Sequence, residues 1–439
     1  RKKLEKLTEN AAESIHGRIL LVGVFAFTNL MRWIRPSFQI PNLDKSDVAN
    51  ESGLAVLTKK GDGFHCTRHL SGHIPRCVAV DPLRPELVYC GTTTQAVWCS
   101  EDAGENWRPA ANGISHATVL AVAVSRHERI GGRGVVYAGT EPSAVFRSDD
   151  GGRTWSECGN LMDLPSSSAW SFPPRPETHH VRWIHLDPHN EGHLFVAIEA
   201  GALIRSKDGG KTWIDRVPTG PFDTHQMASH LSAPGRFYSA AGDGYFETTD
   251  GGETWQRIEE GLQHSYVWSV VVDPADPDTR VIASAASARA AHDKPSAKSF
   301  IYRRSASSEW QLARAGLPES TGRRAAVLAA HPTEPGTFFA TWENDIFLSE
   351  DGGETWQRLE VTWPESFKIG EFRDLALHHR QNVPECSSAR RFGRKASIVS
   401  ATLYRPFFHK ATRGYVDTDP LVRNLTNWIS ETELRFFSS

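Results

Sequence analysis

The chain has 439 residues, of which 39% are hydrophobic, and a formal net charge of −3 at pH 7. A chain of this length can bury a large core, and its near-zero charge gives no electrostatic argument for binding nucleic acid or an anionic membrane. The six cysteines show no Cys-x-x-Cys spacing, so we expect buried free thiols.

Residues 1–50 form an N-terminal extension that is partly apolar. Its apolar run, residues 19–31, is 13 residues long, whereas a membrane-spanning helix needs about 20. Basic residues precede the run as in a signal peptide, but no Ala-x-Ala cleavage site follows. We therefore expect a helix or strand that lies against the main domain of a cytoplasmic protein. Secretion or membrane anchoring through residues 18–34 is the alternative.

Five near copies of one turn follow, from Ser-Glu-Asp-Ala-Gly-Glu-Asn-Trp at residues 100–107 to Ser-Glu-Asp-Gly-Gly-Glu-Thr-Trp at residues 349–356. In such a turn the Asp accepts hydrogen bonds from backbone N–H groups, glycine supplies positive φ, and the Trp is an apolar anchor. We predict a structural role for the aspartates and tryptophans of these boxes, which are Asp102, Trp107, Asp150, Trp155, Asp208, Trp213, Asp250, Trp255, Asp351 and Trp356. A sixth, degenerate copy ends at Trp310.

Strand-like runs surround every box. Alternating apolar residues precede each copy, and two further β-rich runs lie upstream, as at residues 77–80 and 87–89. Two hairpins per unit predict a four-stranded sheet with the box on its third turn.

The repeated S-x-D-x-G-x-T-W pattern resembles the Asp-box, or bacterial neuraminidase repeat, family of β-propellers over roughly residues 54–376. That family includes sialidases, xyloglucan-active glycosidases, sortilin-type receptor domains and photosystem II assembly factors. The resemblance therefore implies a fold and leaves the function open.

The six tryptophan-terminated units leave two fragments. Residues 54–70 have the pattern of an outer hairpin and residues 370–376 that of an inner strand, and together they complete a seventh blade. We predict an all-β fold over residues 51–379: a seven-bladed β-propeller with four-stranded antiparallel blades, closed by N- and C-terminal strands in one blade. Six blades with unpaired ends are the alternative. Residues 380–439 form a C-terminal tail outside the repeat.

Two long insertions, residues 157–178 and 285–298, map to the face opposite the boxes, so we expect a pocket at that end of the central channel. Aligned at the residue that ends each inner strand, three arginines and one histidine share one register. Such convergent cations suit a carboxylate, sulfate or phosphate, whereas salt bridges between blades are the alternative. The predicted ligand-binding residues are Arg76, His180, Arg182, His225, Trp268, Arg324, Glu371 and Arg373.

Catalytic signatures are incomplete. The family's sialidases carry the first of three carboxylate-binding arginines in a Phe/Tyr-Arg-Ile-Pro motif, but here residues 38–41 read Phe-Gln-Ile-Pro and residues 72–75 Gly-His-Ile-Pro. For the Tyr nucleophile and its Glu, Tyr266 and Glu371 are the one pair that the sequence offers. Xyloglucan-type glycosidases place two Asp between two propellers, and one propeller is present here.

We therefore predict a monomeric, non-catalytic propeller that binds a small anionic or carbohydrate ligand, or a protein partner, on the face opposite the boxes. No catalytic residue is assigned. A sialidase-like or related glycoside hydrolase is the alternative. A second alternative is a Zn or Cu site at His179, His180, His225 and His264, because imidazole is a common ligand of both metals.

Overall fold

The computed structural model describes residues 18–24, 53–60, 63–306, 308–343, 345–364 and 371–378, all within one compact unit, Arg1–Asn382. The predicted C-terminal tail and most of the N-terminal extension lie outside the described residues. No helix of the described part is long and apolar enough to cross a membrane.

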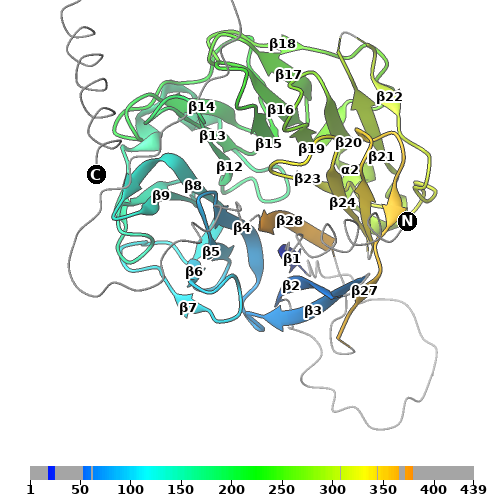
Figure 1. Cartoon of the computed structure of the whole chain (residues 1–439). Helices are drawn as coiled ribbons and strands as arrows, with labels where there is room; N and C mark the ends of the chain where they lie inside the picture. Colours follow the sequence, from blue (N-terminus) through cyan, green and yellow to red (C-terminus); the bar gives the residue numbers. More distant parts are fainter. Residues whose placement is uncertain are drawn as a thin grey trace, which may run out of the picture. The chain divides into compact units, whose positions relative to one another are not determined.

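Seven sheets stand in a ring, as predicted (Figure 1). Six blades follow one another along the chain, each beginning with its inner strand. The first three are β4 (Pro75–Asp81), β5 (Arg84–Thr92), β6 (Val97–Ser100) and β7 (Arg108–Pro109); β8 (Thr118–Ile130), β9 (Arg133–Glu141), β10 (Val145–Ser148) and β11 (Ser156–Glu157); and β12 (Val181–Leu186), β13 (Leu194–Ile198) and β14 (Ala202–Ser206). A single bridge between Arg205 and Ile214 replaces the fourth strand of blade 3.

Blades 4 to 6 repeat this order with short helical turns in one insertion. They are β15 (Thr224–Ser229), β16 (Phe237–Ala241), β17 (Gly244–Thr248) and β18 (Gln256–Arg257); β19 (Tyr266–Val272), β20 (Arg280–Ala285), β21 (Ser299–Arg304) and β22 (Gln311–Leu312); and β23 (Val327–Ala330), β24 (Phe338–Trp342), β25 (Asp345–Ser349) and β26 (Gln357–Arg358). Helix α2 (Ala288–His292) lies in the insertion between β20 and β21. The second strands β13, β16, β20 and β24 are buried along their whole length, so the core lies between neighbouring sheets.

The two ends of the propeller meet in blade 7, which confirms the predicted closure of the ring. Its order is β28 (Glu371–His378), β1 (Arg18–Val24), β2 (Gly53–Lys60) and β3 (Gly63–His69), with β27 (Val361–Thr362) parallel to β3. The expected outer hairpin is β2–β3, but the second strand, β1, comes from the apolar run that sequence reasoning placed outside the repeat. Without β1, both β28 and β2 would expose an unpaired edge.

Each inner strand contacts the next around the ring, from β4 through β8, β12, β15, β19 and β23 to β28 and back to β4. At the last junction the buried Asp374 carboxylate on β28 accepts hydrogen bonds from the N–H of Val78 on β4 and of Leu375, both at 2.9 Å. Burial raises the pKa of Asp374 to about 6, although these two hydrogen bonds oppose the shift.

The box of blade 3 shows how one copy is built. Ser206 Oγ accepts from the N–H of Gly210 at 2.9 Å and donates to Asp208 at 2.8 Å. Asp208 also accepts from the hydroxyl and N–H of Thr212, at 2.7 and 2.9 Å, which lowers its pKa to about 2. The Trp213 indole donates to the carbonyl of Gly159 at 2.7 Å. The turn is thus bonded to itself, and its tryptophan to the chain that leaves the preceding blade.

Replacing a buried box tryptophan should destabilise the ring. The Trp155 side chain is buried and donates its indole N–H to the Ala110 carbonyl at 2.8 Å. Trp155→Ala should lower the free energy of unfolding by about 3–5 kcal/mol, because it leaves a cavity and an unpaired carbonyl. Urea denaturation followed by circular dichroism measures the change. The half-buried Trp213 is the comparison, and an equal or larger loss in Trp213→Ala would contradict this explanation.

The raised pKa of Asp374 predicts a pH dependence of stability. Its folded pKa of about 6 lies above the ordinary value of 3.8. This group's contribution is therefore full below about pH 4 and is lost as the pH rises through 6, by on the order of 3 kcal/mol. Asp374→Asn should remove that loss, so urea denaturation between pH 4 and 7 should show the wild type gaining on the variant as the pH falls. A pH-independent difference between the two proteins would contradict the assignment.

Candidate functional site

The predicted site is the channel mouth opposite the boxes. The boxes join third and fourth strands and share their face with the turns between first and second strands, so every inner strand begins at the other face. There, three consecutive blades bring together His180 and Arg182 of blade 3, His225 of blade 4 and Trp268 of blade 5. Figure 1 shows their strands β12, β15 and β19 side by side around the centre.

A largely buried carboxylate lies beside the first two of these residues. Glu199, which follows β13, accepts a hydrogen bond from His180 Nε2 at 2.6 Å and lies 3.9 Å from Arg182 Nε. Glu141, at the end of β9, lies 4.0 Å from the other ring nitrogen of His180. Burial alone would raise the pKa of Glu199, but the His180 hydrogen bond and the nearby Arg182 and His225 lower it well below its ordinary value. Glu199 is therefore a carboxylate at neutral pH.

Arg182 has a different environment from Arg129 and Arg280, whose guanidinium groups form close ion pairs. Its guanidinium carbon lies 4.7 Å from the centre of the Trp268 ring, and its side chain is 13% exposed. No hydrogen bond reaches this guanidinium from any described residue. By contrast, Arg129 binds both oxygens of Asp81 at 2.9 and 3.0 Å, and Arg280 binds Glu247 at 2.8 Å. Arg182 thus keeps N–H donors for a group that the described chain does not supply.

His225 is the centre of a second group. Its Nδ1 lies 2.7 Å from the carbonyl of Val267, and its Nε2 lies 3.4 Å from Asp223 and 3.3 Å from the Tyr266 hydroxyl. That hydroxyl also lies 3.2 Å from His292 Nε2 on α2. Burial would lower the pKa of His225, but Asp223, Glu199 and the Val267 carbonyl raise it overall. The imidazole therefore carries positive charge more readily than an ordinary histidine does.

Among the other predicted residues, Arg324 has partners outside these two groups. Arg324 acts through its backbone, whose N–H donates to Glu343 at 2.7 Å and whose carbonyl accepts from Trp342 at 2.8 Å. Arg76 is half-buried on β4. Burial raises the pKa of the neighbouring Cys77 thiol, and the positive charges of Arg182 and Arg76 oppose that shift. Arg373 is half-buried on β28.

The Glu371 side chain lies outside the described residues, so the proposed Tyr266–Glu371 pair is not tested. Tyr266 itself engages His225 and His292.

Sequence reasoning missed three acidic residues of the mouth. Glu141, Glu199 and Glu343 each stand where a second strand turns into a third, on the face opposite the boxes. Aligning the second strands of the units, rather than the inner strands alone, would have shown this recurrence. Glu199 lies 3.9 Å from Arg182 of the cationic register, whereas Glu141 pairs with Arg175 and Glu343 with Lys294.

The four histidines of the metal hypothesis have separate partners. His179 packs edge-on against Trp170 at 5.7 Å, and His264 stacks on Phe300 at 4.0 Å and bonds the Tyr302 hydroxyl at 2.8 Å. His180 and His225 are engaged by Glu199 and Asp223. Within the described ranges, no three His, Cys, Asp or Glu side chains gather as metal ligands would. A Zn or Cu site remains a prediction without a defined ligand set.

The second group predicts a measurable electrostatic coupling. Asp223→Asn should lower the pKa of His225, because burial then acts with less opposition. Imidazole NMR titration measures this pKa, with the His225→Asn spectrum identifying the resonance. The remote Glu157→Gln should leave the pKa unchanged, and an unchanged value in Asp223→Asn would contradict the assignment.

The comparisons with known proteins address the fold. A family model described as BNR/Asp-box repeat matches residues 146–157, the box of blade 2. Among solved structures, an ancestral GH74 enzyme is 16% identical, with a TM-score of 0.51 over 69% of this chain and 38% of that one. YCF48 from Cyanidioschyzon merolae is 13% identical, with a TM-score of 0.46 over 68% of this chain and 87% of that one.

YCF48 bound to D1 peptide is 19% identical, with a TM-score of 0.44 over 65% of this chain and 81% of that one. No curated protein matches the chain by sequence. The chain spans little more than a third of the GH74 enzyme's length, and likeness at this identity concerns the fold alone. The chain therefore carries a BNR/Asp-box repeat in blade 2 and folds as a seven-bladed β-propeller.

Proposed function

We propose that the channel mouth opposite the boxes binds an anionic group, best a carboxylate, of a small ligand or of a protein partner. On this proposal the propeller is a binding module and not a hydrolase. The observation that carries it is Arg182, a largely buried guanidinium that lies against Trp268 and donates no hydrogen bond to any described residue.

The surroundings of Arg182 orient its donors. A guanidinium is planar, and its N–H groups point outward in that plane, where a carboxylate can bind two of them at once. Trp268 packs against the guanidinium at 4.7 Å, and Glu199 lies beside its Nε at 3.9 Å. His180 binds Glu199 more closely, at 2.6 Å. The terminal nitrogens of Arg182 therefore remain for a ligand.

The acidic residues limit which ligands fit. Glu199 and Asp223 offset the positive charge of Arg182 and of His225, whose pKa is raised, so the mouth does not bind every anion equally. Asp223 is close to Glu199, since it accepts a hydrogen bond at 2.7 Å from the N–H of Ala200. A ligand could bind Arg182 through a carboxylate and bind Glu199 and Asp223 through neighbouring hydroxyl or amide donors. Acidic sugars and acidic peptide ends share this chemistry.

The same two carboxylates favour a glycoside hydrolase as the second candidate, because such enzymes use a pair of acidic residues. One of the pair must be protonated at working pH to act as general acid. The lowered pKa of Glu199 opposes that role. Binding therefore agrees better with the electrostatics of the mouth.

Removing the guanidinium should abolish binding without unfolding the ring. A panel of sialic acid, glucuronic acid, galacturonic acid and short peptides ending in a free carboxylate or in an amide is the probe, measured by titration calorimetry. We expect the wild type to bind at least one carboxylate. Binding should be at least about tenfold weaker in Arg182→Ala and in Arg182→Lys, because a lysine ammonium lacks the planar pair of N–H donors that binds both carboxylate oxygens. Arg257→Ala, on the outer strand β18, is the matched control.

Two results would contradict the proposal. One is a carboxylate affinity that does not depend on Arg182 in variants with an unchanged melting temperature. The other is release of sugar from sialosides or β-glucans by the purified chain, which would favour the hydrolase.

A further inference from the structure

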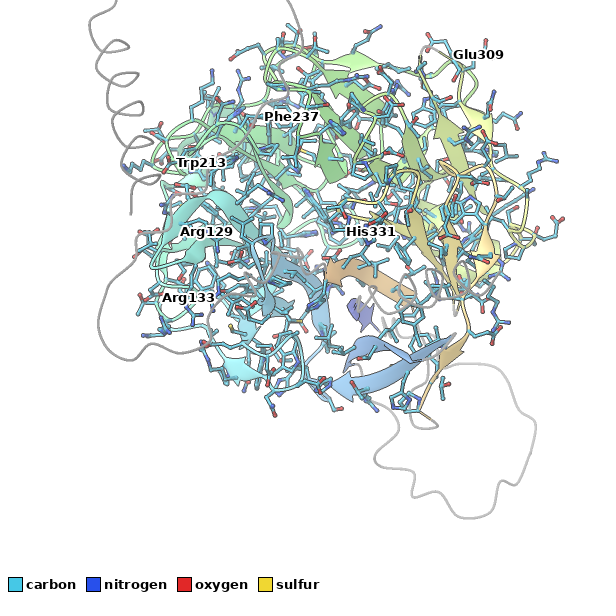
Figure 2. All side chains as sticks on the ribbon, in the orientation of Figure 1. Arg129, Arg133, Trp213, Phe237, Glu309 and His331 are labelled. Carbon is cyan, nitrogen blue, oxygen red and sulfur yellow. The ribbon has the colours of Figure 1, made fainter. Side chains whose placement is uncertain are left out.

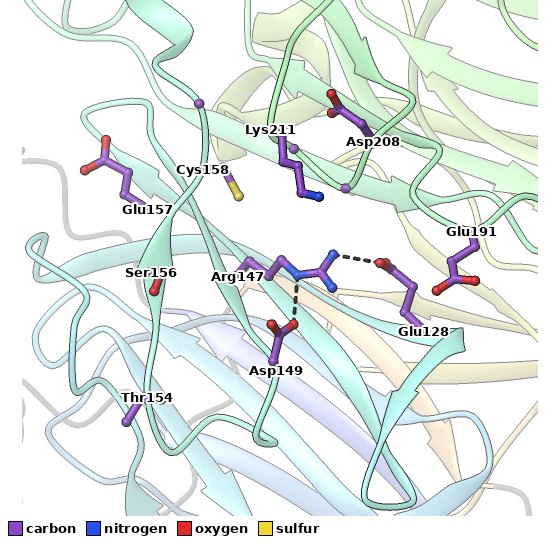
Figure 3. Close-up of a pocket in the computed structure, with 13 residues that line it drawn as sticks. Glu128, Arg147, Asp149, Thr154, Ser156, Glu157, Cys158, Glu191, Asp208 and Lys211 are labelled. Carbon is purple, nitrogen blue, oxygen red and sulfur yellow. Dashed lines mark hydrogen bonds and ion pairs between the residues drawn. The ribbon is translucent and has the colours of Figure 1, made fainter.

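A hollow lies on the box side of the propeller, between blades 2 and 3 (Figure 3). Its volume is about 580 Å³, within the size range of small-molecule sites. The boxes of both blades contribute to its wall, with Arg147 and Cys158 from blade 2 and Lys211 from blade 3. It shares no residue with the channel mouth.

The register of the strands explains why a hollow forms here. Arg147, Arg205 and Arg303 occupy the same position in blades 2, 3 and 5. Each is paired with the residue that directly follows the tryptophan ending its box or degenerate box; these residues are Ser156, Ile214 and Gln311. The three arginines are therefore equivalent, and their partners can be compared directly.

In two cases this arginine binds the next blade through a glutamate. Arg205 binds Glu253 at 2.5 Å, and Arg303 binds Glu354 at 3.0 Å. Both glutamates stand two residues before the box tryptophan, Trp255 or Trp356. The junctions from blade 3 to 4 and from blade 5 to 6 are thus closed by the same ion pair.

At the junction from blade 2 to 3 that box position holds Lys211. Two cations cannot pair, so Arg147 instead binds Glu128 at 2.7 Å and Asp149 at 2.8 Å within its own blade. Its Nη2 makes no hydrogen bond with the described residues, and Lys211 likewise has no ion-pair partner there. The carboxylate that closes the other two junctions is missing between these two side chains.

The rim of the hollow also holds unpaired negative charge. Glu157 and Glu191 are exposed, line opposite sides of the hollow and form no ion pair with any described residue. Between them lies the Cys158 thiol, whose pKa burial raises to about 12, so it stays neutral. Gly159, Gly209 and Gly210 add no side chain to the wall. One free ammonium therefore faces free carboxylates across a polar space.

We propose that this hollow, the inter-blade pocket, binds a free amino acid. The ligand's carboxylate takes the position that Glu253 and Glu354 occupy at the other junctions, between Lys211 and the open edge of Arg147. Its ammonium group binds Glu157 or Glu191. A simple anion would meet the surplus of carboxylates in the pocket, and a simple cation would meet Lys211, so the site favours a ligand that carries both charges.

The charge swap at Lys211 supplies the test. The purified full chain is titrated by calorimetry with each of the twenty amino acids, and with acetate and methylammonium as ligands of single charge. We expect at least one amino acid to bind with a Kd below about 1 mM, and both single-charge probes at least about tenfold more weakly. Lys211→Glu should abolish binding and leave the melting temperature equal or higher, because it restores the ion pair seen at the other junctions.

Arg153→Glu is the matched control: it makes the same charge change at the same box position of blade 2, outside the pocket lining. It should bind as the wild type does. The proposal is overturned if no amino acid binds the wild type, if acetate alone binds as tightly, or if Lys211→Glu binds unchanged. Because the channel mouth lies at the other face, Arg182→Ala should not affect this binding, which keeps the two proposals separable.

Discussion

Closure of the ring is the constraint on which the rest of the structure depends. Seven sheets can share one core only if every inner strand has a neighbour on each side and no blade ends in an unpaired edge. Blade 7 meets both requirements with strands from the two ends of the propeller, β28 and β1–β3. The hydrogen bond from Val78 to Asp374 then joins the last inner strand to the first. This junction places a carboxyl group where water is excluded, and its raised pKa follows from that position.

Closure also determines the electrostatics of the channel mouth. All inner strands start at one face, so polar side chains at their first residues converge on a small space. Figure 2 shows His331, which follows the inner strand β23, near the centre of the ring, and Glu309 at its outer edge. Charges in such a space need partners, since burial without them costs several kcal/mol. Glu199 and Asp223 supply partners for His180 and His225. Arg182 instead lies against the Trp268 ring and 3.9 Å from Glu199, and a ligand can accept the hydrogen bonds that its guanidinium does not make.

Local patterns made the architecture predictable. The hydrogen bonds of the Ser or Thr and Asp side chains in the five intact boxes span at most four residues, as from Thr212 to Asp208, so the local sequence is enough to identify the turn. The role of β1 could not be predicted in this way, because its partner β28 lies some 350 residues away and only an apolar run marks it. Only part of the mouth could be predicted, because some of its residues are brought together by contacts between strands that are distant in the sequence. Inner-strand register found Arg182 and Trp268, but the acidic turns and the backbone role of Arg324 depend on contacts between strands.

Because the blades repeat, each residue can be compared with the residues at the equivalent position of the other blades. Where the units agree, as at the Arg205–Glu253 and Arg303–Glu354 pairs, the residues bind neighbouring blades and carry no information about a ligand. Where one blade has a different residue at such a position and no described residue replaces the lost ion-pair partner, a charged side chain remains available to a ligand. The decayed box before Trp310 shows that departure alone is not enough, since that tryptophan stays buried and the blade is complete. Lys211 differs because its change removes one half of an ion pair and leaves a hollow beside the other.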